Sequence, residues 1–308
     1  MISSYTVGIY PRSEELIDAT RKNTKNLSSL YLAGKKEYIS IQKKAKLGYV
    51  CDPLLHWDDI FRPFSKLKSV KLEALNRVYE TNTFYRKLSF DGDLSDAGNI
   101  IRSNLAVSLL PKNRVACVAD PYTFADVHLS PKYKKKEEFT IAIAKMLRKE
   151  IDTLVKSSFG LIHLVAPSIA YNAKVDFGLV KEALNIITRG LKAKTVLHLY
   201  FGDVSKKMEK LLDLPVSGLG FDITSTPISS IKKHSFSGKL LAVGMVNSYN
   251  TKLEDKAECI LELNNIISKT KPDESFVTTN FDLQYLPKEF AVRKILRLGE
   301  IAKGVKNA

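Results

Sequence analysis

Short apolar runs alternate along the chain with longer segments in which apolar residues recur every three or four positions. The short runs predict strands at residues 5–10, 49–54, 114–119, 161–166, 195–202, 218–224, 240–246 and 275–280. Nearly unbroken runs such as LIHLVA at 161–166 are typical of parallel strands that are buried on both faces. The longer segments predict helices, and the clearest lie at 137–156, 175–191 and 287–303.

Repeated strand–helix units require crossover connections, which wrap helices around a parallel sheet. About eight such units predict an α/β fold, a (β/α)8 barrel of TIM type that forms a single domain over residues 1–308. An open doubly wound sheet is the alternative, but the Gly218-Leu-Gly220 pair lacks the third glycine of a phosphate-binding turn. A further extended piece at 83–90 is predicted as a hairpin strand outside the closed sheet. Thr251 and Glu254 have the spacing of a capping box at a helix start.

No apolar run is long enough to cross a membrane, and the first residues lack the pattern of a signal peptide. The three cysteines, Cys51, Cys117 and Cys259, are far apart and form no CxxC pair. This favours a reducing, cytoplasmic location over a disulfide framework or a zinc knuckle.

The chain is strongly basic, because 48 Lys and Arg residues outnumber 33 Asp and Glu residues and leave a net charge of +15. Such a charge suits a polyanionic partner, such as nucleic acid or an acidic cofactor tail. It equally suits a lysine-rich solvated surface of the kind common in proteins that work at high temperature. Because the excess is spread along the whole sequence, we expect the second explanation and no nucleic-acid partner.

Polar residues at the carboxyl ends of the predicted strands are the candidates for function, because active sites of such barrels lie there. They are Arg12, Asp52, His198, Tyr200, Asp222 and Asn247, which are predicted to bind a substrate or donor. An Asp at a strand end can also cap the next helix, and a strand-end Arg can form a rim salt bridge. No residue is assigned a catalytic role, since the chain has no GxSxG elbow and no Cys paired by pattern with a His. No metal is expected, because His198 has no obvious His or Cys partner at another strand end.

Taken in order, the strand-end motifs resemble those of cobalamin-independent methionine synthase, a family built from two related barrels. The most similar is TVLHLYFGD at 195–203, which resembles a Tyr-Phe-Gly-Asp run of the family's amino-terminal half. The others are TVGIYPR at 6–12, QKKAKLGYV at 42–50, YETNTFY at 79–85, LPVSGLGFD at 214–222 and LLAVGMVN at 240–247. Each motif is weak alone, and the resemblance depends on their collinear order over nearly the whole chain.

The departures from the family pattern concern zinc. The family's catalytic half holds zinc with a His-x-Cys pair, a Glu and a later Cys, and the zinc activates the homocysteine thiol. The corresponding positions here read His198 and Tyr200, Asp222, and Asn280. Where the family has an acidic residue after the fifth strand, this chain has VAPS at 165–168. The segment EELI at 14–17 corresponds to a family segment with a Lys associated with folate, and it lacks that Lys.

The resemblance implies a stand-alone barrel of the amino-terminal type that has no cofactor of its own. It implies a methyltransferase role in methionine biosynthesis, with a methylated folate or pterin as donor. A separate zinc-bearing catalytic barrel would be the partner, without which we expect no activity. The alternatives are a repurposed barrel that binds a small anionic ligand and, from a different class, a basic nucleic-acid-binding protein.

Overall fold

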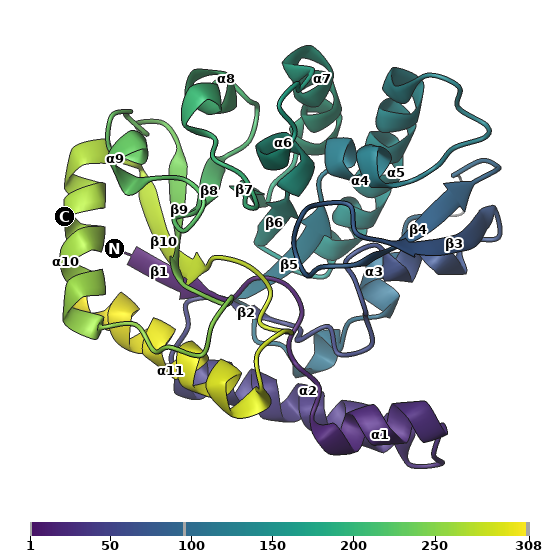
Figure 1. The fold of residues 1–308 in the computed structure, drawn as a ribbon, viewed down its shortest axis with the longest axis horizontal. Helices are drawn as coiled ribbons and strands as arrows, with labels where there is room; N and C mark the ends of the chain where they lie inside the picture. Colours follow the sequence, from purple (N-terminus) through teal and green to yellow (C-terminus); the bar gives the residue numbers. More distant parts are fainter. Residues whose placement is uncertain (1, 95–96, 306–308) are drawn as a thin grey trace.

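The structure, a computed structural model, describes residues 2–94 and 97–305. Eight strands form one sheet in the order β1-β10-β9-β8-β7-β6-β5-β2, and each hydrogen-bonded pair is parallel. Their bounds are β1 Ile2–Tyr5, β2 Val50–Cys51, β5 Arg114–Ala119, β6 Leu161–Val165, β7 Lys194–Leu199, β8 Gly218–Asp222, β9 Leu240–Val246 and β10 Glu274–Thr279. Helices surround this sheet (Figure 1).

The two ends of the sheet nearly meet. The Tyr49 amide, next to β2, donates to the Ser4 carbonyl of β1 over 3.0 Å, and the Tyr10 amide donates to the Pro53 carbonyl, also over 3.0 Å. The sheet is therefore a nearly closed parallel barrel, and the predicted (β/α)8 fold class is confirmed.

The long helices lie where the apolar periodicity predicts them. α5 spans Lys136–Lys156, α7 spans Phe177–Thr188 and α11 spans Lys288–Gly304, within a few residues of the predicted ranges. The remaining helices are α1 Glu14–Lys22, α2 Leu27–Lys44, α3 Ile100–Ser103, α4 Pro121–Val127, α6 Pro167–Tyr171, α8 Met208–Leu212, α9 Ile228–Ile231 and α10 Lys256–Thr270, with the short 3-10 turns η1 Arg62–Lys66, η2 Val107–Leu109 and η3 Ser205–Lys207. In the described ranges, no helix has both the length and the apolar composition needed to cross a membrane.

An antiparallel hairpin lies outside the barrel sheet (Figure 1). Its second strand, β4 (Tyr85–Phe90), confirms the extended piece predicted at 83–90. Its first strand, β3 (Val70–Asn76), is mostly exposed, and its weak apolar pattern gave no strand prediction. The loop between the two strands reaches the mouth of the barrel, as described below.

The predicted strand at 5–10 is wrong in its bounds, because β1 ends at Tyr5. Residues 6–10 are buried and mostly apolar, but they leave the sheet and turn at Gly8, whose φ is 73°. A Cβ atom at Gly8 would lie 1.3 Å from Asp282 Oδ1, so only glycine lets the chain pass there. The predicted strand at 49–54 is likewise reduced to Val50–Cys51, since the chain bends at Leu54, with φ of 53°.

The predicted capping box at Thr251 and Glu254 is also wrong. α10 begins after Asp255, whose side chain accepts from the Glu258 amide over 2.9 Å. Glu254 instead accepts hydrogen bonds from the Asn247 amide over 2.9 Å and from Lys294 Nζ over 2.7 Å. Lys294 is buried, and leaving its ammonium group unpaired would be costly. The ion pair of Glu254 with Lys294 is therefore more favourable than a capping hydrogen bond from Glu254.

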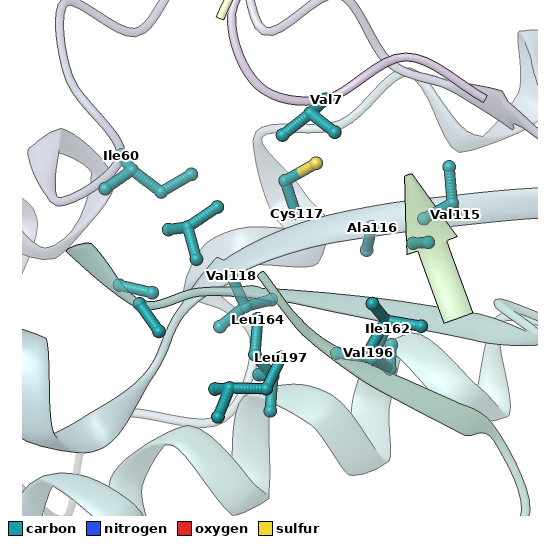
Figure 2. Packing of buried hydrophobic residues seen from close by; sticks show 14 of the residues in the cluster. Val7, Ile60, Val115, Ala116, Cys117, Val118, Ile162, Leu164, Val196 and Leu197 are labelled. Carbon is teal, nitrogen blue, oxygen red and sulfur yellow. The ribbon is translucent and has the colours of Figure 1, made fainter. Parts of the chain in front are cut away.

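The core has two parts on opposite sides of the strands. Val118, Leu164 and Leu197 are register neighbours on β5, β6 and β7, and they pack toward the helices. Cys117 points to the other side, toward Val7 (Figure 2). The helix side is apolar, whereas the barrel interior contains polar side chains, and these lead to the candidate site.

Candidate functional site

Asp222, the last residue of β8, is the centre of a buried hydrogen-bond network at the barrel mouth. Its Oδ1 accepts from the Thr224 amide (2.9 Å), the Thr224 hydroxyl (2.7 Å) and Asn280 Nδ2 (3.0 Å). Its Oδ2 accepts from the hydroxyls of Ser225 (2.7 Å) and Tyr249 (3.0 Å). Asp222 is fully buried, and these bonds offset the cost of removing a carboxylate from water.

Asn280 follows β10 and extends the network into the barrel. Its Oδ1 accepts from both the amide and the hydroxyl of Ser248, each over 2.8 Å. Its carbonyl lies 2.9 Å from His198 Nε2, so this ring nitrogen carries the proton. Burial lowers the pKa of His198, which is therefore a neutral imidazole that helps to hold the β10 end in place.

A second histidine lies deeper in the barrel. His163 Nδ1 is 3.0 Å from the Tyr5 hydroxyl, and the rings of His163 and His198 are 4.8 Å apart. Burial also lowers the pKa of His163 well below its ordinary value. Gly220 makes room for this pair, because a Cβ atom there would lie 2.4 Å from His198 Nδ1.

An aromatic pocket of about 370 Å³ opens above the network, and we call it the mouth pocket. Its lining residues are Thr81, Asn82, Thr83, Phe201, Ser225, Ser248, Tyr249, Phe281 and Tyr285. The Phe281 and Tyr285 rings are nearly parallel, at 13° and 6.2 Å, and the Tyr249 ring lies 6.1 Å from Phe281. Thr81 to Thr83 come from the hairpin loop, so the hairpin forms one wall.

Phe201 lines the mouth pocket in a conformation that side chains rarely adopt, with φ of 68°. It follows β7, and its ring contacts Phe281 at 4.8 Å and Tyr79 at 5.6 Å. Tyr79 is itself fixed by a 2.7 Å hydrogen bond to Ser168. Strained backbone of this kind concentrates at functional sites, where the surrounding structure holds it in place.

Asp282 lies next to Phe281 at the same end of the barrel. Burial raises the pKa of its carboxyl to about 7. Oδ1 accepts from the Ile9 amide (3.2 Å) and Oδ2 accepts from Gln284 Nε2 (3.1 Å). It thus combines a shifted pKa with a position beside the pocket, which is typical of functional carboxyls.

A larger groove, which we call the lysine groove, has a volume of about 1010 Å³. It is lined by Gly202 and Asp203, directly after Phe201, and by four lysines, Lys174, Lys206, Lys207 and Lys210. Lys207 donates to the carbonyls of Ile169, Ala170 and Asn172 at the end of α6, over 2.7–2.9 Å. The residues that line the groove therefore begin directly after Phe201, which lines the mouth pocket.

Comparison with known proteins identifies the family. The model of the cobalamin-independent synthase N-terminal domain matches residues 71–271, more than half of the chain. The chain belongs to this family.

Curated relatives and solved structures agree with that assignment. The methionine synthase of Saccharolobus solfataricus is 24% identical over 328 residues, covering 99% of this chain and 95% of the relative. That of Sulfolobus acidocaldarius is 23% identical and covers 97% and 90%. A B12-independent methionine synthase from Shewanella sp. W3-18-1, solved with selenomethionine, has a TM-score of 0.75 at 17% identity and covers 98% of this chain and 96% of that one. The structure of a putative vitamin-B12-independent methionine synthase from Listeria monocytogenes has a TM-score of 0.72 at 13% identity and covers both chains completely.

The residues at the zinc-ligand positions of the cobalamin-independent synthase pattern do not fit a zinc ion. His198 donates to a carbonyl, and Asn280 and both Asp222 oxygens are committed to each other and to hydroxyls. Burial raises the pKa of Tyr200 well above its ordinary value, so it is a neutral phenol. Across residues 2–94 and 97–305, no three His, Cys, Asp or Glu side chains are grouped to hold a metal. Hydrogen bonds among these side chains occupy the positions where such a site would lie.

The structure brings four of the six candidate residues together. His198 and Asp222 are joined through Asn280, and the Tyr200 ring lies 5.9 Å from the His198 ring. Asn247 borders the network, where its Oδ1 accepts from the Tyr249 amide over 2.8 Å. The prediction that these residues bind a ligand stays a prediction.

Arg12 and Asp52 lie apart from this network. Arg12 donates to the Leu55 carbonyl over 2.7 Å and forms a 2.9 Å salt bridge with Asp58. Asp52 is buried, where it pairs with Lys35 over 3.3 Å and accepts from the Ala106 amide over 2.7 Å. Arg12 makes the salt bridge that was the alternative to a binding role, whereas Asp52 forms a buried ion pair and not the helix cap that was its alternative.

Sequence reasoning did not select the residues that line the mouth pocket. Ser225, Ser248, Tyr249 and Phe281 all lie within three residues of a strand end, where they could have been found. Apart from His198 and Tyr200, the selected residues are charged or amide side chains, and the other hydroxyl and aromatic residues at strand ends are missed. A search of strand ends for aromatic residues would have found Tyr249 and Phe281.

Proposed function

We propose that this chain is the zinc-free barrel of a split cobalamin-independent methionine synthase. In this proposal its mouth holds a methylated folate or pterin donor. A separate zinc-bearing barrel then catalyses methyl transfer from that donor to homocysteine. The observation that carries the proposal is the hydrogen-bonded network of His198, Asp222 and Asn280 at the positions of the zinc ligands. If the residues at the zinc-ligand positions bind one another and not zinc, the zinc that activates the homocysteine thiol must be held by another chain.

The shape and charge of the two cavities support a donor of this kind. The mouth pocket offers ring faces of Phe201, Tyr249, Phe281 and Tyr285 to a flat heterocycle. The lysine groove, whose lining includes Gly202 directly after Phe201, offers ammonium groups to an acidic tail. One ligand that has both a ring and a carboxylate tail would use both cavities.

The test is methyl transfer from 5-methyltetrahydropteroyltriglutamate to homocysteine, with zinc measured on the same samples. The chain is assayed alone and then mixed with the zinc-bearing barrel encoded in the same genome. We expect little zinc and no activity from the chain alone, and activity from the mixture above that of the zinc barrel by itself. Zinc-loaded activity from the chain alone, or no effect of the chain on the partner, would refute the proposal.

A matched pair of variants tests the lysine groove. Lys174→Ala with Lys206→Ala should raise the KM for the triglutamate donor about tenfold, and the KM for a monoglutamate donor less. Lys22→Ala with Lys25→Ala removes the same charge from α1 and the turn after it, and should leave both KM values unchanged. Equal effects of the two pairs would mean that only the overall charge matters.

A further inference from the structure

Three buried polar atoms inside the barrel have no hydrogen-bond partner among the residues that the structure describes. They are His163 Nε2 on β6, His198 Nδ1 on β7 and Thr278 Oγ1 on β10. All three residues are 0% exposed, so bulk solvent does not reach these atoms. A buried polar atom without a partner costs free energy, and native proteins satisfy nearly all such atoms.

The three side chains point into the barrel interior. The Tyr5 hydroxyl of β1 lies 3.0 Å from His163 Nδ1, so these two side chains meet across the interior. His198 likewise reaches the Asn280 carbonyl after β10 over 2.9 Å. Thr278 is the register partner of Tyr5 and lies two residues before Asn280, so its side chain points to the same side of the sheet. The Thr278 hydroxyl therefore faces the two imidazole rings, whose centroids are 4.8 Å apart.

The hydrogen bonds already made determine which of these atoms can donate. His198 Nε2 carries the ring hydrogen, because it faces the Asn280 carbonyl, and this leaves His198 Nδ1 as an acceptor. Within the described part of the chain, the Tyr5 hydroxyl has no acceptor other than His163 Nδ1, so it donates to that atom. Burial keeps the pKa of His163 low, and the neutral ring then carries its hydrogen on Nε2. One ring therefore presents a donor, the other presents an acceptor, and the Thr278 hydroxyl can be either.

We propose that the barrel interior binds one ordered water molecule, which accepts from His163 Nε2 and donates to His198 Nδ1. The Thr278 hydroxyl is its third partner. A water molecule has two hydrogens and two lone pairs, so it can satisfy all three atoms at once. The rings do not satisfy each other directly, because they are tilted by 41° and form no hydrogen bond between these two nitrogens.

This water completes a polar column along the inside of the barrel. Asn280 bonds Asp222 at the mouth and also bonds His198. The water continues the column from His198 to His163, which bonds Tyr5 on β1. The column joins β8, β10, β7, β6 and β1, and it depends neither on zinc nor on the methyl donor of the proposed function.

A high-resolution crystal structure of the unmodified chain tests the proposal directly. We expect density for one water within about 2.7–3.2 Å of both His163 Nε2 and His198 Nδ1. Heteronuclear NMR of the histidine rings at neutral pH should place the hydrogen on Nε2 in both residues. The absence of water density at the two nitrogens, or a hydrogen on Nδ1 of His163, would overturn the proposal.

Thr278→Val distinguishes a bound water from an unsatisfied hydroxyl, because the two predict changes of opposite sign. Val has nearly the shape of Thr and lacks the hydroxyl. If the hydroxyl holds the water, its loss should lower the folding equilibrium constant about threefold to tenfold in urea denaturation. An unchanged or higher constant would contradict the proposal, since removal of an unsatisfied hydroxyl relieves a cost. Thr251→Val, the same change at an exposed position, is the control and should alter the constant by no more than about twofold.

Discussion

The Tyr249 hydroxyl donates a 3.0 Å hydrogen bond to Asp222, which connects the loop after β9 to the end of β8. The ring of Tyr249 lines the mouth pocket and the residue is 45% exposed, whereas its hydroxyl is held at the buried network. The same contact therefore fixes a pocket wall and satisfies a buried carboxylate. Because Tyr249 belongs to both the pocket wall and the Asp222 network, a change in the network should alter the shape of the mouth pocket.

Asp222→Ala should destabilise the protein strongly. It leaves the hydroxyls of Thr224, Ser225 and Tyr249 and the Asn280 amide without their acceptor, at a cost of roughly 3–5 kcal/mol. Urea denaturation measures the loss. Asp213→Ala is the control, since this exposed carboxylate pairs with exposed Lys181 and its loss should cost less than about 1 kcal/mol. Similar losses for the two variants would contradict the role of Asp222 as the network centre.

Two glycine variants should behave in opposite ways. Gly220→Ala would place a Cβ atom 2.4 Å from His198 Nδ1 and should cost about 1–3 kcal/mol through displacement of the ring. Gly160→Ala meets nothing within 4 Å and should be neutral or stabilising by up to about 1 kcal/mol. Thermal unfolding of both variants gives the comparison, and a stable Gly220→Ala protein would show that His198 is not tightly held.

Much of the barrel could be predicted because its strands are buried on both faces, which leaves long apolar runs. β6 and β9 are buried along their whole length, and their predicted positions differ from the observed bounds by no more than one residue. The same signal fails at residues 6–10, which are equally buried but lie outside the sheet, since β1 ends at Tyr5 and the chain turns at Gly8. An apolar run in the sequence indicates that a segment is buried. It does not show whether the backbone of that segment pairs in the sheet.

The candidate site could be predicted only in part, for a related reason. Strand ends indicated Asp222 and His198, and the structure connects them through Asn280. The partners of Arg12 and Asp52 could not be predicted, because Leu55 and Lys35 reach them through loop and helix packing rather than through strand order. Polar residues at predicted strand ends therefore indicate where the mouth of the barrel lies, but they do not distinguish binding residues from structural ones.

Lys35→Met should destabilise the protein by about 3–5 kcal/mol, because it leaves the Asp52 carboxylate buried without a counter-charge. The side chains of Lys35 and Asp52 are only 6% and 1% exposed. Lys181→Met breaks the exposed pair with Asp213 by the same change and should cost less than about 1 kcal/mol. Urea midpoints of the two variants decide the matter, and equal values would mean that the buried pair contributes no more than a surface pair.

Asp282→Asn should change the dependence of stability on pH. Burial raises the pKa of Asp282 to about 7 in the folded protein, whereas an unfolded Asp loses its proton near pH 4. Between these values the unfolded state releases the proton first, so the contribution of Asp282 to stability falls as the pH rises from about 4 to about 7. Asn does not titrate, so the unfolding free energy of Asp282→Asn minus that of the unmodified chain should increase over this window and stay level above it. The lost contact with Gln284 adds only a constant offset.

Urea denaturation at several pH values between 4 and 8 measures this difference. Asp120, whose pKa burial also raises to about 7, is present in both proteins and cancels in the subtraction. A difference that stays constant across the whole range would show that the carboxyl of Asp282 keeps an ordinary pKa. A rise confined to the window from 4 to 7 would establish a protonated carboxyl beside the mouth pocket in mildly acidic solution.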